Sequence, residues 1–256
     1  MSKTVVISGG TSGIGRATAL ARAARGDRVI VIGSRPDAPY RADLTTIAEV
    51  RRVAAEIARD HPVVDALVLC ANRIFPRRTE TPDGLEATFA LYYLSRYLLG
   101  ELLAPQLDAA GNPVIVNVSG TGITAGRVRW EDPQFTRGYG AIRAQVQAGR
   151  ANDLLGVAHT GRARYVLYHP GFTRPGSHPN PLVSGVISGL ARVAARPVDE
   201  SARPIAAWID APPAAKLTAI DRGRPVPLSL RTLNPGDAAR LRAYTEAAVA
   251  RAAGRA

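Results

Sequence analysis

The strongest constraint on the fold is a glycine-rich turn near the start of the chain, Ser8-Gly9-Gly10-Thr11-Ser12-Gly13-Ile14-Gly15. It follows the apolar run Val5-Val6-Ile7 and precedes a segment with helical periodicity. Glycines at this spacing allow a tight turn and a close approach of the backbone to a ligand, and the N-terminus of the helix presents free N–H groups. The strand–turn–helix context predicts a loop that binds the pyrophosphate of a dinucleotide. The residues expected to contact it are Gly9, Thr11, Ser12, Gly13, Ile14 and Gly15.

The end of the second predicted strand indicates which dinucleotide binds. Residues 28–33 have the pattern of that strand, and Arg35 follows it, where an acidic residue would accept hydrogen bonds from the ribose of NAD. An arginine can instead hold a ribose 2′-phosphate. The sequence therefore favours NADP(H) over NAD(H).

Strand and helix patterns alternate along the chain, which predicts an α/β fold: a Rossmann-type, doubly wound parallel sheet with helices on both faces. Only seven residues separate Arg35 from Asp43, so the connection between the second and third strands is shortened and the third strand is a stub that ends at Asp43-Leu44. Residues 1–256 are expected to form a single domain. Further strands are predicted at 66–70, 114–118, 164–168 and 216–220, and helices at 46–60 behind a Thr46–Glu49 capping box, at 83–108, and from Asn234 onward.

Composition narrows the class of protein. The formal net charge is +12, but the arginines are scattered and no nucleic-acid motif occurs, so we expect no nucleic-acid partner. The single cysteine, Cys70, cannot form an internal disulfide, which fits a cytoplasmic protein. No apolar run approaches the roughly 20 residues that span a membrane, and no residue spacing indicates a metal site. The sequence is compatible with a homo-oligomer and does not determine the oligomeric state.

Several motifs, in this order, resemble those of the short-chain dehydrogenase/reductase family, and more closely its retinol-dehydrogenase-like branch. They are the glycine loop, Asp43-Leu44, Asn117-Val118-Ser119, Tyr139 and His169-Pro170-Gly171. The resemblance extends over essentially the whole chain and implies a nicotinamide-dependent oxidoreductase. It also implies cofactor contacts from Asp43, Leu44, Ala71, Asn72, Tyr139, Arg143, Pro170, Gly171, Phe172 and Thr173.

The family's chemistry uses a serine, a tyrosine, a lysine and an asparagine, and the chain keeps only the tyrosine. Tyr139 stands at the position of the proton donor, and Arg143 occupies the lysine position, where the spacing predicts that it shares a helix face with Tyr139. The serine position is Gly120. The candidate catalytic residues are Tyr139 and Arg143, Ser119 and Thr121 on either side of Gly120, and Tyr92 at the asparagine position.

Three functions are compatible with these departures. The first is an NADP(H)-dependent oxidoreductase that reduces a carbonyl, or oxidises an alcohol, on a medium-sized apolar substrate in bacterial specialised metabolism. The second is a non-redox enzyme on the same fold (a cyclase, isomerase or dehydratase), and the third is a non-catalytic NADP(H)-binding regulator. Residues 172–198 are rich in proline, glycine and apolar residues and are predicted to form a lid over an apolar substrate.

Overall fold

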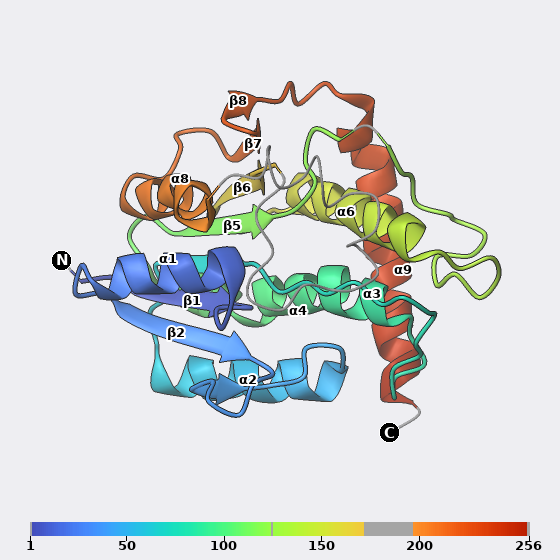
Figure 1. The fold of residues 1–256 in the computed structure, drawn as a ribbon, viewed down its shortest axis with the longest axis horizontal. Coiled ribbons are helices and arrows are strands. Elements are labelled where there is room, and N and C mark those ends of the chain that lie inside the picture. Colours follow the sequence, from blue (N-terminus) through green and yellow to red (C-terminus); the bar gives the residue numbers. More distant parts are fainter. Residues whose placement is uncertain (1, 124, 172–196, 255–256) are drawn as a thin grey trace.

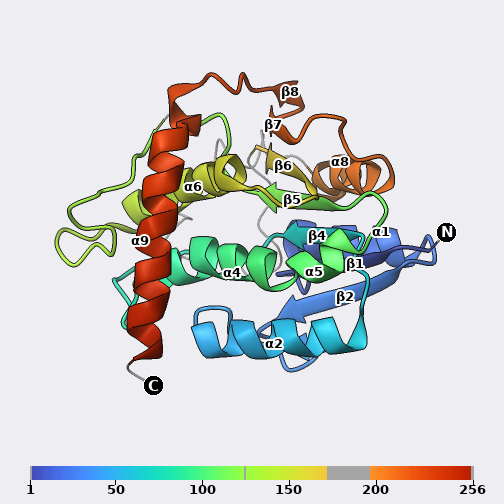
Figure 2. The same ribbon diagram turned by 180° about the vertical axis from the view of Figure 1, so that it is seen from behind.

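A computed structural model describes residues 2–123, 125–171 and 197–254, and within them eight strands form one sheet (Figures 1 and 2). The strand order is β3-β2-β1-β4-β5-β6-β7-β8. Neighbouring strands are parallel except β7 and β8, which are antiparallel. The predicted Rossmann-type sheet is therefore confirmed, with one antiparallel edge strand added. The strands are β1 (Thr4–Ser8), β2 (Arg28–Gly33), β3 (Tyr40–Arg41), β4 (Ala66–Leu69), β5 (Val114–Val118), β6 (Arg164–His169), β7 (Leu217–Asp221) and β8 (Arg224–Pro225).

Helices cover both faces of the sheet. On one face lie α1 (Gly13–Ala23) and α8 (Val198–Asp210). On the other lie α2 (Ile47–Asp60), α4 (Ser95–Leu102) and α6 (Ala141–Ala158), and α9 (Pro235–Ala253) packs against α6. The shorter elements are α3 (Ala87–Phe89), the π-helical η1 (Ala90–Leu94), α5 (Ala104–Asp108) and the 3-10 helix η2 (Arg231–Leu233).

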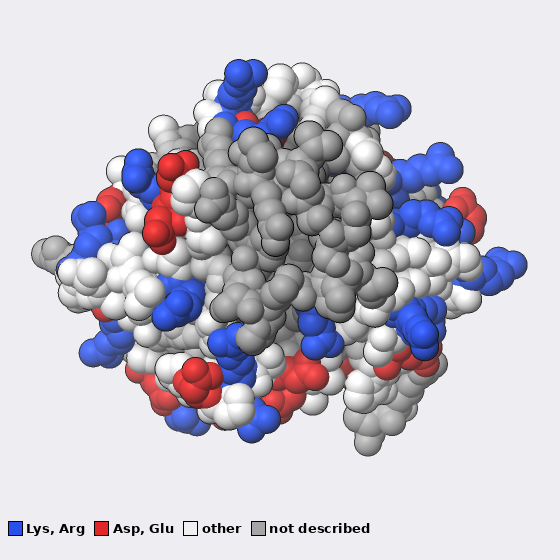
Figure 3. Space-filling model, viewed as in Figure 1, with Lys and Arg blue, Asp and Glu red and all other residues white. Residues whose placement is uncertain are grey.

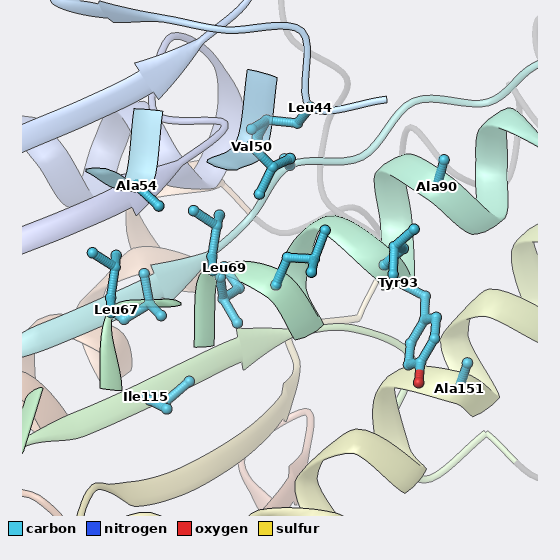
Figure 4. Packing of buried hydrophobic residues seen from close by; sticks show 14 of the residues in the cluster. Leu44, Val50, Ala54, Leu67, Leu69, Ala90, Tyr93, Ile115 and Ala151 are labelled. Atoms are coloured by element: carbon cyan, nitrogen blue, oxygen red, sulfur yellow. The ribbon is translucent and has the colours of Figure 1, made fainter. Parts of the chain in front are cut away.

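The apolar strand sequences explain this layered arrangement. Along β1, Val6 joins the larger buried cluster, while Val5 and Ile7 join the cluster on the opposite face. A strand buried on both faces needs an unbroken apolar run rather than an alternating one. Figure 4 shows part of the larger cluster, to which Leu67 and Leu69 of β4 and Val50 and Ala54 of α2 contribute.

The strand order also determines where a ligand can bind. β1 pairs with β2 on one side and with β4 on the other, so the chain reverses its winding direction between these neighbours. In open parallel sheets, a crevice forms outside the carboxyl ends of the strands at such a reversal. The glycine loop leaves β1 at this position.

The third strand is shorter than predicted. β3 ends at Arg41, two residues before Asp43, because the Asp43 carboxylate turns the chain by accepting hydrogen bonds from the Thr45 N–H at 3.0 Å and the Thr45 hydroxyl at 2.8 Å. The shortened connection itself is confirmed, since no helix separates β2 from β3 in the described chain.

The predicted capping box at the start of α2 is wrong. Thr46 makes no side-chain capping bond, and its hydroxyl instead donates to the Asp43 carbonyl at 3.2 Å. The N–H of Ile47 donates to the carboxylate of Asp83 at 2.8 Å. A residue far away in the sequence thus supplies the cap, which local spacing cannot predict.

The helix predicted at 83–108 is divided into four pieces. It begins at Ala87, where the Glu86 carboxylate accepts the N–H groups of Thr88 and Phe89, both at 2.8 Å. The π-helical η1 follows, and Pro105 sits in the first turn of α5, where its missing N–H is tolerated. The N-cap predicted at Asn234 is confirmed, because its side chain accepts the Asp237 N–H at 2.9 Å.

Charged residues of both signs are interspersed on the face drawn in Figure 3. On the described part of that face, the high net charge therefore does not reflect a broad region of one sign. No helix in the described part of the chain is both long and apolar enough to cross a membrane.

A buried ion-pair network joins α1 to α8. The guanidinium of Arg22 pairs with Asp27, and it donates to the Asp210 carboxylate at 2.6 Å and to the Ala206 carbonyl at 3.2 Å. Only 2% of the Arg22 side chain is exposed. Arg25 reaches the same Asp210 at 3.0 Å, but 59% of its side chain is exposed.

We expect Arg22→Ala to lower the free energy of unfolding by about 3–5 kcal/mol, because it leaves the buried Asp27 without its partner. Arg25→Ala is the matched control and should cost less than ~1 kcal/mol, since exposed ion pairs contribute little. Urea denaturation followed by circular dichroism measures both values. Equal losses in the two variants would contradict this interpretation.

Candidate functional site

The first turn of α1 packs so closely on the glycine loop that no side chain fits between them. A Cβ on Gly15 would lie 2.4 Å from the carbonyl oxygen of Gly9, and one on Gly9 would lie 2.7 Å from the backbone of Ala71. Ser12 precedes α1 without a side-chain capping bond, which leaves the first N–H groups of the helix open to an anion. This loop fits the pyrophosphate of a dinucleotide.

Three adjoining pockets surround the loop, and Ser12 borders all of them. The β5 pocket, of about 520 Å³, lies between the loop and the residues that follow β5 and β6. The Asp43 pocket, of about 600 Å³, lies beyond β2 and β4, and the Arg35 pocket lies beside α1. Such volumes are typical of ligand sites.

Most described residues predicted to bind the cofactor line one of these pockets. Gly9, Ser12, Gly13, Ile14, Gly15, Asn72, Pro170 and Gly171 border the β5 pocket; Thr11, Asp43, Leu44 and Ala71 border the Asp43 pocket; Arg35 borders the Arg35 pocket. Phe172 and Thr173, and the predicted lid except for 197–198, lie outside the described residues.

The Arg35 pocket contains two cationic side chains next to the N-terminus of α1. Arg35 follows β2 and is exposed, and Arg16 of α1 borders the same pocket. Asp37 and Asp199 border it as well. The two guanidinium groups and the positive end of the helix can bind a phosphate.

The structure does not bring Tyr139 and Arg143 together on a helix. α6 begins at Ala141, so Tyr139 precedes the helix, and the expectation of a shared helix face is wrong. The Tyr139 hydroxyl donates to the carbonyl of Phe75 at 2.7 Å, and burial raises the pKa of this phenol. Arg143 is exposed. Neither borders the β5 pocket, and their catalytic roles remain predictions.

Of the two hydroxyl residues beside Gly120, Ser119 borders the β5 pocket, whereas Thr121 is buried and does not border it. The Ser119 hydroxyl lies 3.2 Å from that of Thr121. The Thr121 hydroxyl donates to the Asp153 carboxylate at 2.8 Å, and Asp153 pairs with Arg150. A continuous set of hydrogen bonds therefore runs from the pocket wall to a buried carboxylate.

Tyr92 borders the β5 pocket on a different side, next to a buried arginine. The guanidinium of Arg96 lies 4.7 Å from the centre of the Tyr92 ring. Burial raises the pKa of the Tyr92 phenol above its ordinary value, and the charge of Arg96 offsets only part of this rise. The Tyr92 ring therefore forms part of the pocket wall. Its raised pKa does not favour a role as an acid near neutral pH, which would need a lower pKa.

His169 has a partner that sequence spacing did not suggest. Its Nδ1 lies 2.8 Å from the carboxylate of Asp221, which is its register partner on β7. Arg222 and His169 both hold the pKa of the Asp221 carboxyl below its ordinary value against the effect of burial. Because His169 borders the β5 pocket, this pair fixes one wall.

Sequence reasoning missed the face that α6 presents to the pocket. That face includes Gln145, Gly149 and Asp153, which recur at four-residue intervals. Gln145 exchanges side-chain hydrogen bonds with Asn72 at 3.1 and 3.2 Å, and so joins α6 to the end of β4. The four-residue spacing could have identified the face.

Metal and thiol chemistry find no support in the described residues. They contain no group of three or more His, Cys, Asp or Glu side chains that could hold a metal ion. Burial raises the pKa of the Cys70 thiol to about 12, which makes it a poor nucleophile.

Comparison with known proteins identifies the family of this chain. A profile described as "short chain dehydrogenase" matches residues 3–131. The chain is 33% identical over 274 residues to "Putative daunorubicin C-13 ketoreductase DnrU" of Streptomyces sp. (strain C5), covering 96% of this chain and 92% of that protein. It is also 32% identical to mouse retinol dehydrogenase 13, over 51% of this chain and 44% of that protein.

Solved structures support the same fold. The 3-alpha-hydroxysteroid dehydrogenase from Pseudomonas sp. B-0831, complexed with NADH, superposes with a TM-score of 0.68. The alignment covers 86% of this chain and 96% of that one at 22% identity. Identity at this level shows a shared fold alone.

We expect Gly15→Ala to weaken NADP⁺ binding at least about tenfold, because the added Cβ must push α1 away from the Gly9 carbonyl. Gly100→Ala is the control, since Gly100 lies in α4 and an added Cβ would meet no atom outside its own helix turn within 4 Å. Calorimetric titration measures both affinities. Unchanged binding in Gly15→Ala would argue against this loop as the pyrophosphate site.

Proposed function

The chain belongs to the short-chain dehydrogenase/reductase family of oxidoreductases, and we propose that it is an NADP(H)-dependent reductase of a carbonyl on a medium-sized apolar substrate. The observation that carries the proposal is the position of Ser12, which borders the β5, Asp43 and Arg35 pockets together. A dinucleotide bound on this loop can therefore extend from the Arg35 pocket to the hydroxyl groups beyond β5. When bound, the reduced nicotinamide would supply a hydride to the substrate carbonyl carbon.

The lining of the β5 pocket supports an apolar substrate. Apolar side chains contributed by Ile14, Val118, Ile123 and Val146 border it, together with the Tyr92 ring. Ser119 contributes a hydroxyl group on the wall that can donate to a substrate oxygen. A role in bacterial specialised metabolism is supported by the Streptomyces relative, whose name refers to a daunorubicin ketoreductase.

The pair Arg16 and Arg35 supports NADP(H) rather than NAD(H), because both border the pocket beside the N-terminus of α1. Arg16 contributes a second positive charge there, and neither group has a salt-bridge partner within the described residues. A charge-assisted contact to the 2′-phosphate contributes about 1.5–3 kcal/mol.

A second function, non-redox chemistry on the same pocket, is favoured by one observation. The tyrosine expected to exchange the proton donates to Phe75 outside the β5 pocket, and the family lysine is replaced by the exposed Arg143. A cyclase, isomerase or dehydratase would use the pocket without net loss of NADPH.

One experiment separates these functions. Purified protein is incubated with NADPH and a panel of apolar ketones and quinones that includes phenanthrenequinone, while NADPH absorbance and product mass are followed together. We expect stoichiometric loss of NADPH and a gain of two hydrogens in the product. An isomeric or dehydrated product with unchanged NADPH would establish the non-redox function, and tight nucleotide binding without any turnover would favour a regulator.

We expect Arg35→Ala to weaken NADPH binding by roughly 10- to 150-fold and to leave NADH binding nearly unchanged. Arg28→Ala is the control: Arg28 is also exposed but lies at the start of β2, whereas Arg35 follows its end. Fluorescence titration with both nucleotides gives the affinities. A loss shared equally by NADPH and NADH would contradict a 2′-phosphate contact.

A further inference from the structure

A buried carboxylate in the β5 pocket has no role in the chemistry described so far. Asp153 is 1% exposed as a residue, yet it borders the pocket beside Ser119. Its Oδ1 accepts the Thr121 hydroxyl at 2.8 Å, and Thr121 lies 3.2 Å from the Ser119 hydroxyl. Thr121 is completely buried and does not border the pocket. The three side chains thus form a route that begins and ends at the pocket wall.

We propose that Asp153 exchanges the reaction's proton with the substrate oxygen through the hydroxyls of Thr121 and Ser119. This inference rests on the proposed function, and assigns the proton to groups other than Tyr139. In reduction, hydride addition breaks the carbonyl π bond, and the alkoxide oxygen takes the Ser119 proton. Ser119 then takes the Thr121 proton, and Thr121 takes the proton of the Asp153 carboxylic acid. Solvent reprotonates the Asp153 carboxylate after each turnover.

The directions of the hydrogen bonds in the structure suit alcohol oxidation, the reverse of carbonyl reduction. Thr121 donates to Asp153, so an ionised carboxylate is already placed to receive a proton passed from an alcohol. In the reducing direction each hydroxyl rotates and donates toward the pocket. Rotation of a hydroxyl is a local change that leaves the backbone in place.

The surroundings of Asp153 keep both protonation states accessible. Burial raises the pKa of its carboxyl to about 6, while Arg150 and the Thr121 hydrogen bond act in the opposite direction. Two further titratable groups interact with Asp153 within the described residues: the charge of Asp153 adds to the raised pKa of the Tyr92 phenol on η1 and of the Tyr165 phenol on β6. Burial raises the pKa of both phenols, so both stay neutral near this pH.

Arg150 has a separate, positioning role. Its guanidinium pairs with Asp153 and donates to the Ile123 carbonyl at 2.7 Å, which ties the loop after β5 to α6. If Asp153 had a purely structural function, it would only hold the Arg150 guanidinium in place for its hydrogen bond to Ile123. The test therefore needs a measurement that a purely structural contact would not change, such as the pH dependence of kcat.

The test uses NADPH and phenanthrenequinone, or the fastest ketone of the panel, and measures kcat and KM across pH. We expect wild-type reduction to fall about tenfold per pH unit above pH ~6, because the acid form is lost. Alcohol oxidation needs the carboxylate and should rise up to pH ~6 and then level off. Asp153→Asn should lower kcat by at least ~100-fold, leave the Kd for NADPH unchanged and abolish this pH dependence.

Threonine variants test the route itself. Thr121→Val keeps the shape and removes the hydroxyl, and should lower kcat as Asp153→Asn does, whereas Thr121→Ser should restore most of the rate. Thr18→Val is the matched control, because Thr18 is a completely buried threonine of α1 whose hydroxyl has no hydrogen-bond partner in the described structure. An Asp153→Asn enzyme with wild-type kcat and pH profile would overturn the proposal, as would a loss confined to Tyr139→Phe.

Infrared difference spectroscopy keeps the proposal testable if no ketone is reduced. Protein with bound NADP⁺ is titrated with acid, and we expect a carboxylic-acid C=O band with a midpoint near pH 6 that Asp153→Asn removes. Absence of that band would overturn the proton route whatever the substrate. Absence of turnover with the band present would instead count against the proposed reductase function.

Discussion

A buried guanidinium ties together the ends of two neighbouring strands, β4 and β5, whose following residues border the β5 pocket. Arg96 is 1% exposed and donates to the Ala71 carbonyl at 2.9 Å and to the Val118 carbonyl at 2.8 Å, and it also bonds to the side chain of Asn117. No carboxylate pairs with it within the described residues, so carbonyl dipoles and the Tyr92 ring compensate its charge. The carboxyl ends of β4 and β5 therefore keep a fixed separation.

The features that could be predicted from the sequence are those fixed by local backbone requirements. The glycine loop is one, because Gly15 admits no side chain against the Gly9 carbonyl wherever the rest of the chain goes. The buried strands are another, since a strand covered on both faces must be apolar throughout, as β4 is. Together with the alternation of strand and helix patterns, these features were sufficient to predict the sheet, its layers and the position of the glycine loop.

The features that could not be predicted depend on residues distant in the sequence. The spacing of Tyr139 and Arg143 is compatible with a helix, but spacing does not determine where α6 begins, and the structure begins it two residues after Tyr139. The cap of α2 comes from Asp83, and the partner of His169 comes from β7. Asp153 has helical spacing from Gln145, yet only tertiary packing against Thr121 gives that face its chemical meaning.

A phenol and a carboxyl reach a useful acidity from opposite directions. A tyrosine with an ordinary pKa near 10 needs a neighbouring positive charge that lowers the pKa, whereas an aspartic acid near 4 needs burial that raises it. The pKa of Asp153 rises to about 6 because burial outweighs the opposing charge of Arg150. If Arg150 were replaced by a neutral residue, the carboxyl would become a weaker acid, and the loop that Arg150 ties to α6 would lose a contact. The same guanidinium thus limits how far burial raises the pKa and fixes the loop that leads from Thr121 toward Ile123, so acidity and geometry cannot be changed independently at this site.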